Sequence, residues 1–409
     1  MELEKEREEM SERKKYHLIN ELPHIYELED MMDFCGRYQH LYIYGCAENQ
    51  QYLLKYFDMC GVDIDGFTVS FSPESFTCIY RELPVKLIND VISIPDTGVI
   101  VGLADKYYDY VIPFFREHHF DAYFLMSEYN KRSIAWQMRP RPREELTFEF
   151  SLADHCNIAC QMCDHYAQVS DKYFPDFSIF EKDIIQMGKI FDHQIAAISF
   201  LGGEPTLNNE IVRYLRVTRR EFPEAEIIIL TNGIKLLELE HSPFGNLWEE
   251  CRKLGVHITV TVYPIKIDYA AIEKKAEEYG VPLAMSSDIH AQNLTTIVKT
   301  SDKHTMDLSG SVPKFYCVNC LYFNKFNVLK DGKLYMCPIE AHIDIFNHAF
   351  KQNLKIREGD YLDIYKVKDW HEIAEFTSNY VPFCSYCDLK HWGHYGPWHT
   401  STKQLEEYV

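Results

Sequence analysis

Three cysteines lie close together in the stretch HCNIACQMCDH, residues 155–165: Cys156, Cys160 and Cys163. Thiolates at such short spacings bind metal ions or iron–sulfur clusters. A tetrahedral zinc site and a four-iron cluster each need four ligands, so three cysteines leave one position open. Catalytic metal sites keep such an open position for a substrate or a cofactor. The stretch therefore predicts a catalytic metal centre.

A second set of cysteines occurs late in the chain, at Cys320, Cys337, Cys384 and Cys387. The dipeptide Asp331-Gly332 between two apolar runs predicts a β-hairpin, which would bring Cys320 and Cys337 together. Four thiolates would fill a zinc site or an iron–sulfur cluster, and spacing alone does not separate the two. Cys317 could replace Cys320 as a ligand, or serve as a free thiol beside a substrate.

Composition limits the classes of protein that the chain can belong to. The 409 residues carry a formal net charge of −20, which argues against nucleic acid as the substrate. No apolar run approaches the roughly 20 residues that a membrane helix needs, and the charged N-terminus lacks the apolar core of a signal peptide. We therefore expect a cytoplasmic protein, in which the 13 cysteines bind metal or stay reduced.

The first third of the chain predicts a small domain that precedes the cysteines. Residues 1–39 have a helical pattern, and strands alternate with helices over 40–130, which indicates a Rossmann-like α/β domain. Gly45 ends the first strand, but the second and third glycines of the dinucleotide fingerprint are missing after it. A docking domain without a cofactor is the favoured interpretation, and nucleotide binding stays open.

A second alternating pattern follows a linker predicted at 131–145 from its prolines and charges. Residues 146–309 predict repeated βα units, which form either a partial (β/α) barrel or an open parallel sheet. The cysteine loop, the GGEP stretch at 202–205 and the TNG stretch at 231–233 each follow a strand. Because ligands bind at the carboxyl ends of parallel strands, we expect all three on one rim. Residues 310–409 form a cysteine-rich third region.

The core region from 146 to about 300 resembles the radical S-adenosylmethionine (SAM) superfamily. The resemblance rests on the three-cysteine motif together with the GGEP and TNG stretches that follow it. It implies that Met162 packs the adenine and that the GGEP stretch binds the amino group of SAM. Thr259 or Thr261 would contact the ribose or the carboxylate. The implied SAM-binding residues are Met162, Gly202, Gly203, Glu204, Pro205, Thr231, Asn232, Thr259 and Thr261.

The resemblance also explains the missing fourth cysteine. In the superfamily, three thiolates hold three irons of a [4Fe–4S] cluster, and the amino and carboxylate groups of SAM occupy the fourth. An electron from the reduced cluster, delivered by a flavodoxin or a ferredoxin, then cleaves SAM and releases a 5′-deoxyadenosyl radical. The alternative is a zinc site completed by His155 or His165, which we otherwise expect to be ordinary loop histidines.

Residues 317–390 resemble the shortened "twitch" version of the SPASM auxiliary-cluster domain. This implies a second, fully ligated [4Fe–4S] cluster on Cys320, Cys337, Cys384 and Cys387, for electron transfer or for structure. A zinc knuckle is the alternative. The aromatic tail from His391 to Val409 could cap the active site or simply pack against the auxiliary domain.

The later part of the chain resembles twitch-type proteins encoded with polysaccharide and glycosyl-transfer genes. A small carbohydrate or nucleotide-linked sugar is the substrate that this implies. The outcome would be oxidation of an alcohol carbon or epimerisation, in which a thiol such as Cys317 returns a hydrogen atom. Cys251 is a second candidate donor, although its helical stripe predicts a core position. Radical modification of a peptide and a non-catalytic zinc scaffold are the alternative functions.

Overall fold

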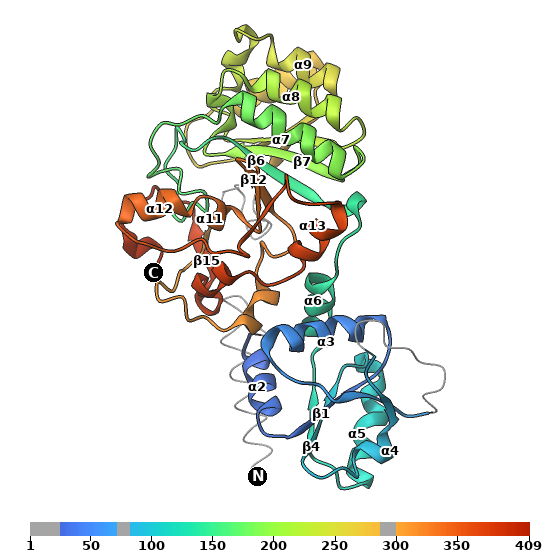
Figure 1. The fold of residues 1–409 in the computed structure, drawn as a ribbon. Helices are drawn as coiled ribbons and strands as arrows, with labels where there is room; N and C mark the ends of the chain where they lie inside the picture. Colours follow the sequence, from blue (N-terminus) through green and yellow to red (C-terminus); the bar gives the residue numbers. More distant parts are fainter. Residues whose placement is uncertain (1–24, 72–81, 287–299) are drawn as a thin grey trace. The chain divides into compact units, whose positions relative to one another are not determined.

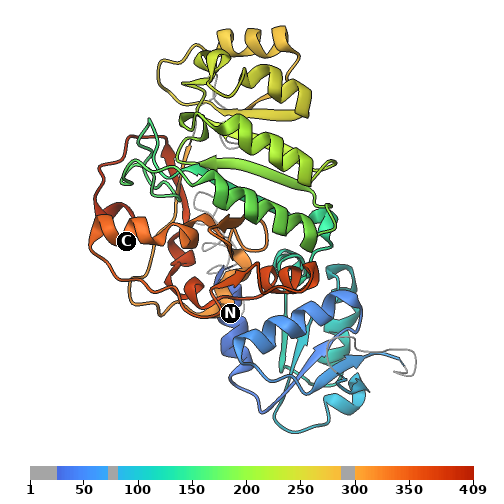
Figure 2. The same ribbon diagram turned by 45° about the horizontal axis from the view of Figure 1, so that its top comes forward.

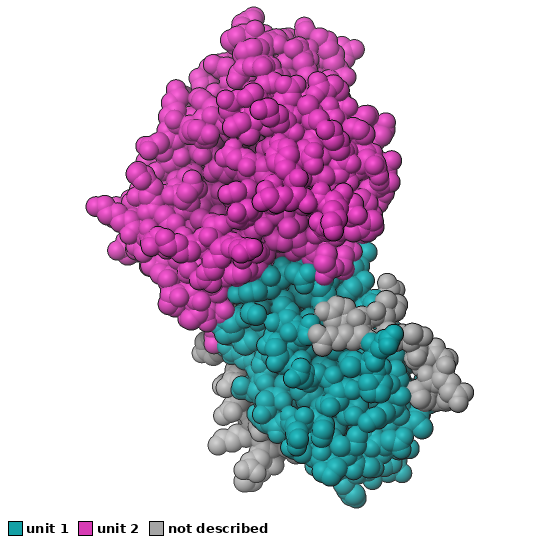
Figure 3. Space-filling model, in the orientation of Figure 1, with its two compact units in different colours: residues 1–139, 313–320, 378–380 teal, residues 140–312, 321–377, 381–409 magenta. Residues whose placement is uncertain are grey.

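A computed structural model describes residues 25–71, 82–286 and 300–409. The chain divides into two compact units (Figure 3). Unit 1 comprises residues 1–139, 313–320 and 378–380, and unit 2 comprises the rest. The helix predicted within residues 1–24 lies outside the described residues, whereas α2 (Ile25–Cys35) confirms helix in the segment that follows.

Unit 1 is built on a five-stranded parallel sheet (Figure 1). The strands lie in the order β3-β2-β1-β4-β5, which confirms the Rossmann-like fold predicted from the alternating pattern. Their bounds are β1 (His40–Tyr44), β2 (Gly66–Val69), β3 (Val85–Leu87), β4 (Thr97–Val101) and β5 (Tyr123–Leu125). The chain moves outward from β1 in both directions, and right-handed crossovers then place helices on both faces of the sheet.

The helices of unit 1 are α3 (Glu48–Cys60), α4 (Ile88–Val91), α5 (Tyr108–Glu117) and α6 (Glu128–Met138). Every residue of β4 is buried, as expected for a central strand of a parallel sheet that is covered on both faces. Helix α6 occupies most of the stretch that the sequence assigned to a linker. Pro140 and Pro142 come after the helix ends, because proline disfavours helical backbone at the residue before it.

Unit 2 contains an eight-stranded sheet in the order β10-β9-β8-β7-β6-β12-β13-β14. Strands β6 to β10 run parallel, β12 joins β6 in parallel, and β13 and β14 continue antiparallel. The bounds are β6 (Thr147–Ala153), β7 (Ala197–Gly202), β8 (Glu226–Thr231), β9 (Val256–Thr261), β10 (Leu283–Ser286), β12 (Asn327–Lys330), β13 (Lys333–Tyr335) and β14 (Tyr361–Asp363). The described strands form an open sheet that corresponds to part of a barrel.

The crossover helices of unit 2 are α7 (Phe177–Ile190), α8 (Ile211–Glu221), α9 (Leu247–Leu254) and α10 (Tyr269–Tyr279). Because β6 to β10 follow one another in order, right-handed crossovers put these helices on one face, and Figures 1 and 2 show α7, α8 and α9 there. The side chains of Ile211 and Leu215, one turn apart on α8, are fully buried. Within the described ranges, no helix has the length and apolar composition needed to cross a bilayer.

The hairpin predicted at Asp331-Gly332 is confirmed. Strands β12 and β13 pair antiparallel on either side of it, with Lys330 opposite Lys333. Both turn residues have positive φ, 51° at Asp331 and 73° at Gly332, which a type I′ turn requires. The C-terminal region also holds α11 (Pro338–Ala341), α12 (Ile343–Phe350), α13 (Trp370–Thr377) and a ribbon of β11 (Thr300–Lys303) with β15 (Gly393–Pro397).

Candidate functional site

A cavity of about 310 Å³ opens in unit 2 where β6, β7, β8 and β9 end. Its lining includes the three cysteines of the first motif, which follow β6. Gly202, Gly203 and Glu204 follow from β7, and Thr231 and Asn232 from β8. The stretches that the sequence placed on one rim therefore surround a single cavity.

Two glycines allow the cysteine loop to lie directly against the end of β7. The Gly203 amide donates to the Ala153 carbonyl at 2.7 Å, and the Glu204 amide donates to the His155 carbonyl at 3.0 Å. A Cβ on Gly203 would lie only 2.0 Å from the His155 oxygen. Gly202 has φ +117°, and a Cβ there would lie 2.5 Å from the Ala153 oxygen. The two glycines thus allow the cysteine loop to lie close to the end of β7, and this contact positions the cysteines.

Glu204 joins the ends of β7 and β8. Its Oε1 accepts hydrogen bonds from the Thr206 amide at 3.0 Å, from the Thr206 hydroxyl and from the Thr231 hydroxyl at 2.5 Å. Its Oε2 accepts from the Asn232 amide at 2.8 Å. Burial raises the pKa of this carboxyl, and the hydrogen bonds from these donors offset part of the rise. Glu204 therefore organises the rim through four contacts within the chain.

Asn232 connects this rim to the cysteine loop. Its Nδ2 donates to Asn157 Oδ1 at 2.7 Å and lies 3.7 Å from Cys156 Sγ. Its Oδ1 accepts from the Ile234 amide at 3.0 Å, which fixes the side-chain orientation. An amide N–H directed at a sulfur is the type of contact that tunes a metal-bound thiolate.

The C-terminal tail pairs with the cysteine loop. The Gln161 amide donates to the His399 carbonyl at 3.1 Å, and the Ser401 amide donates to the Ala159 carbonyl at 2.9 Å. Tyr408, next to the last residue, donates from its hydroxyl to the Cys163 carbonyl at 3.1 Å. The tail therefore packs against the cysteine loop, and its Trp398 lines the cavity.

The three motif cysteines line the cavity together. Burial raises the pKa of Cys156 to about 12 and also raises that of Cys163, so both stay protonated until a cation offsets the lost hydration. No His, Cys, Asp or Glu side chains in the described ranges converge in threes on a point that suits one metal ion. A [4Fe–4S] cluster does not need that convergence, because each thiolate binds a different iron. Three cysteine side chains at one cavity therefore suit such a cluster.

A chain of polar side chains lines another part of the cavity. His165 Nδ1 lies 2.8 Å from Asp164 Oδ1, and the Tyr322 hydroxyl donates to Asp164 Oδ2 at 2.8 Å. His304 Nε2 lies 3.2 Å from the same hydroxyl. Burial alone would raise the pKa of Asp164, but the adjacent imidazole of His165 outweighs it and lowers that pKa. We expected His165 to be an ordinary loop histidine. It is instead buried and belongs to this series of polar side chains.

Three residues of the lining carry buried polar atoms that have no hydrogen-bond partner within the described part of the protein. They are His165 Nε2, Gln168 Oε1 and Trp398 Nε1. A buried polar atom without a partner costs about 1–3 kcal/mol, so such atoms usually meet a ligand or water. Their presence around one cavity indicates that it binds a polar molecule.

The remaining predicted SAM-binding residues differ in how they lie. Met162 lines the cavity, is 3% exposed and has φ +56°, a backbone conformation that places its side chain inward of the loop. Thr261 lines the cavity and Thr259 does not. Pro205 is buried at the start of the short 3₁₀ helix Pro205–Leu207, outside the lining.

Several lining residues were not anticipated from the sequence. Gln168, His304 and Tyr322 belong to no motif, and only the topology brings them to the cavity. Trp398 comes from the tail, where an unusual density of aromatic residues was the available signal. Tyr263 also lines the cavity, with its hydroxyl 3.6 Å from Cys160 Sγ and its ring centroid 5.5 Å from that of Trp398.

The second cysteine set is divided between the two compact units. Cys320 belongs to unit 1, whereas Cys337, Cys384 and Cys387 belong to unit 2. None of the four forms a disulfide within the described residues. Cys317 is buried in unit 1, with its Sγ 3.9 Å from Met59 Sδ. The second ligand set and the role of Cys317 as a hydrogen donor stay predictions.

Fold and site define an α/β domain with a cysteine-lined cofactor cavity at its strand ends. Residues 150–264 match the family model described as Radical SAM superfamily, so the chain contains a radical SAM domain. Enzymes of this family use a [4Fe–4S] cluster and SAM. A search among curated proteins found no match.

Several solved structures are similar to part of this chain. BtrN in complex with AdoMet and 2-DOIA is 18% identical, with a TM-score of 0.37, covering 60% of this chain and 94% of that one. AdoMet-bound anSMEcpe is 12% identical, with a TM-score of 0.35, covering 55% and 80%. Streptococcus suis SuiB bound to precursor peptide SuiA is 12% identical, with a TM-score of 0.32, covering 66% and 76%.

Proposed function

We propose that the protein cleaves SAM reductively and removes a hydrogen atom from a small hydroxylated substrate, a sugar or a nucleotide-linked sugar, which it oxidises. One observation carries this proposal. The three cysteines of the first motif and three unpaired buried polar atoms, on His165, Gln168 and Trp398, line the same cavity at the strand ends of the radical SAM domain. A cavity with this lining suits a cluster, SAM and a polar substrate together.

The first motif holds the cofactor in this proposal. Cys156, Cys160 and Cys163 would bind three irons of a [4Fe–4S] cluster, which supplies the electron that splits SAM into methionine and a 5′-deoxyadenosyl radical. Gly202 and Gly203 keep the cysteine loop close to β7, and Glu204 ties that strand to β8. These residues orient the partners and keep the rim rigid.

Met162 and Thr261 are the proposed SAM contacts from the chain. The buried Met162 side chain offers an apolar surface for the adenine. The Thr231 hydroxyl is engaged with Glu204 and with the Gly233 amide, so we assign it to support of the rim. Because Thr261 lines the cavity and Thr259 does not, we assign the ribose or carboxylate contact to Thr261.

In this proposal, His304 accepts the proton of the substrate hydroxyl. Oxidation of an alcohol carbon releases this proton in addition to the abstracted hydrogen atom and one electron. His304 lines the cavity, and its Nε2 is linked through the Tyr322 hydroxyl to the Asp164 carboxylate, a chain that orients the imidazole. The substitution His304→Asn is expected to lower product formation about 100-fold while SAM cleavage continues.

The positions of the cysteines favour oxidation over epimerisation, because epimerisation needs a thiol that can return a hydrogen atom to the substrate. The cysteines among its described lining residues are those of the first motif, which would be bound to iron. Cys251 lies in the core of unit 2, where burial raises its pKa. Cys320, Cys337, Cys384 and Cys387 would hold a second [4Fe–4S] cluster, which would supply an acceptor for the substrate electron.

Deuterium transfer tests the proposed substrate class. Sugars deuterated at their alcohol carbons would be incubated with the reconstituted protein, SAM and dithionite, and 5′-deoxyadenosine would be analysed by mass spectrometry. Deuterium in 5′-deoxyadenosine and a carbonyl in the sugar are the expected results. Transfer from a peptide encoded beside the gene, with none from any sugar, would contradict the carbohydrate assignment and favour peptide modification.

A further inference from the structure

Unit 1 contains a cavity of its own, of about 260 Å³, at the carboxyl ends of β1 and β4. The order of the sheet reverses between these two strands, since β2 and β3 lie on one side and β5 on the other. Open parallel sheets bind their ligands at this switch point. The cavity therefore occupies the position where a domain of this fold recognises a small molecule.

The loop after β1 does not suit a dinucleotide. Ala47 and Gln50 stand at the second and third glycine positions of the fingerprint and line the cavity, where glycine would bring a pyrophosphate against the backbone. The Ala47 amide is already engaged with Gln50 Oε1 at 2.9 Å, and Gln50 Nε2 donates to the Gly102 carbonyl at 2.7 Å. Gln50 thus closes the loop by joining the ends of β1 and β4.

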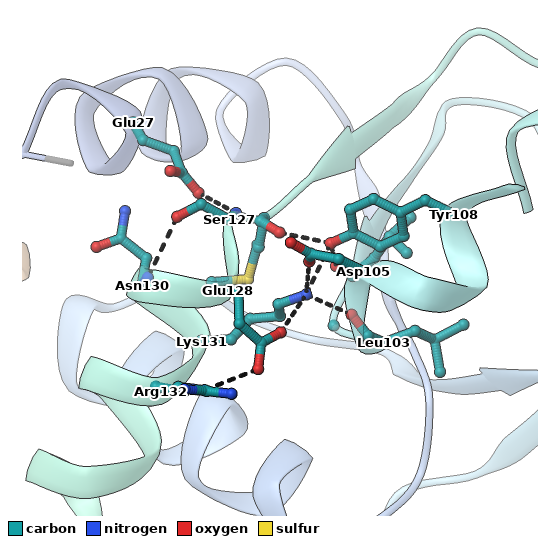
Figure 4. A network of polar contacts seen from close by, with 12 residues as sticks. Glu27, Leu103, Asp105, Tyr108, Ser127, Glu128, Asn130, Lys131 and Arg132 are labelled. Carbon is teal, nitrogen blue, oxygen red and sulfur yellow. Dashed lines mark hydrogen bonds and ion pairs between the residues drawn. The ribbon is translucent and has the colours of Figure 1, made fainter. Parts of the chain in front are cut away.

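The charges around the cavity are paired with each other. Lys131 Nζ donates to the Leu103 carbonyl at 2.5 Å and to Asp105 Oδ1 at 2.6 Å, and it lies 3.3 Å from Glu128 Oε2 (Figure 4). Arg132 Nε donates to Glu128 Oε1 at 2.9 Å. A phosphate would compete with these carboxylates for the two cations, so the charge balance disfavours an anionic ligand.

The same groups suit an uncharged ligand that carries hydroxyls. Carboxylate oxygens of Glu128 accept hydrogen bonds from hydroxyls, and the exposed Asn49 amide offers both donors and an acceptor. The Tyr107 ring, 45% exposed, lines the cavity and presents an apolar face to the C–H side of a sugar. Pockets for drug-sized ligands span about 300–1,000 Å³, so this smaller cavity suits one saccharide ring.

We propose that the switch-point cavity of unit 1 binds one uncharged saccharide residue. Glu128 and Asn49 contact its hydroxyls, and the Tyr107 ring packs against its apolar face. This site lies outside the radical SAM domain, and its binding requires neither a cluster nor SAM. It gives unit 1 the function of a carbohydrate-recognition domain.

Saturation-transfer NMR on the full-length protein tests this proposal without SAM or reductant. The probes are D-glucose, D-galactose, N-acetyl-D-glucosamine and uridine diphosphate. At least one of the three sugars is expected to bind, and uridine diphosphate is expected not to compete with it. Because no radical chemistry is involved, the result is independent of whether 5′-deoxyadenosine is formed.

Three variants identify the binding site. Ala104→Trp fills the cavity from an exposed position, Tyr107→Ala removes the ring, and Tyr110→Ala changes a 76% exposed tyrosine outside the lining. The first two are expected to weaken sugar binding at least about 10-fold and the third to leave it unchanged. Melting curves show that each variant folds. Binding of uridine diphosphate alone, the absence of binding by all three sugars, or binding that survives Ala104→Trp would overturn the proposal.

Discussion

Each of the two sheets of this protein has a cavity at the carboxyl ends of its parallel strands, yet the polar groups of the two cavities differ. In unit 2, three cysteines and unpaired buried atoms such as Trp398 Nε1 line the cavity. In unit 1, Lys131 and Arg132 are already paired with Asp105 and Glu128. Strand ends thus provide the place for a site, whereas the loops decide whether it awaits a charged cofactor or a neutral ligand.

The two strand ends also differ in the space that surrounds their glycines. Gly203 follows β7 with no space for a Cβ against the cysteine loop. Gly102 follows β4 in unit 1, where a Cβ would meet the flexible Leu53 side chain at 3.2 Å. The loop in unit 2 is therefore fixed by direct contact with the backbone of the strand end, and the loop in unit 1 leaves room for adjustment.

The substitution Gly203→Ala is expected to have the largest effect on stability. A Cβ that lies 2.0 Å from a carbonyl oxygen forces the backbone apart, at a cost of about 3 kcal/mol or more of the unfolding free energy. Gly102→Ala is the matched control and should cost less than about 1 kcal/mol. Denaturant titration of both variants measures the difference, and equal losses would break the comparison between the two strand ends.

A second comparison concerns one carboxylate from each cavity. Glu204→Gln places a donor against the Asn232 amide and is expected to cost about 2 kcal/mol. Glu128 is 37% exposed in its side chain, so water replaces the ion pairs lost in Glu128→Gln, at a cost below about 1 kcal/mol. The same titration tests this pair. A larger loss for Glu128→Gln would show that unit 1 depends on its ion pairs.

The pH dependence of stability gives the smallest expected effect. Burial raises the pKa of Glu149, on β6, to about 7. The folded state then holds a proton that the unfolded state releases above its ordinary pKa near 4.5, so stability falls as pH rises from about 4.5 to 7. Glu149→Gln should therefore stabilise the protein more at pH 8 than at pH 4.5. A benefit that is equal at both pH values would contradict this origin.

The sequence predicted the features that depend on local pattern. Strand and helix periodicity gave both parallel sheets, and Asp331-Gly332 gave the hairpin, because the positive φ of both residues is a local requirement. The helix α6 was missed, since the prolines that follow it have the composition of a linker. A helix with several charged residues ahead of two prolines lacks a clear sequence signature.

The cavity residues outside the motifs depend on long-range contacts. His304 and Tyr322 lie far from the cysteines in the chain, and their hydrogen bonds to each other and to Asp164 arise from tertiary structure. No periodicity or spacing encodes these contacts. The choice between Thr259 and Thr261 likewise needed the position of the β9 end.

Release of 5′-deoxyadenosine tests the central claim most directly. The reconstituted wild-type protein, given SAM and dithionite under anaerobic conditions, should release it, and so should Cys251→Ala, in which a core cysteine of unit 2 is changed. Cys156→Ala should reduce the release at least about 100-fold because it removes a ligand of the first cluster. Release that persists in Cys156→Ala, or that is absent from iron-loaded wild-type protein, would contradict the account.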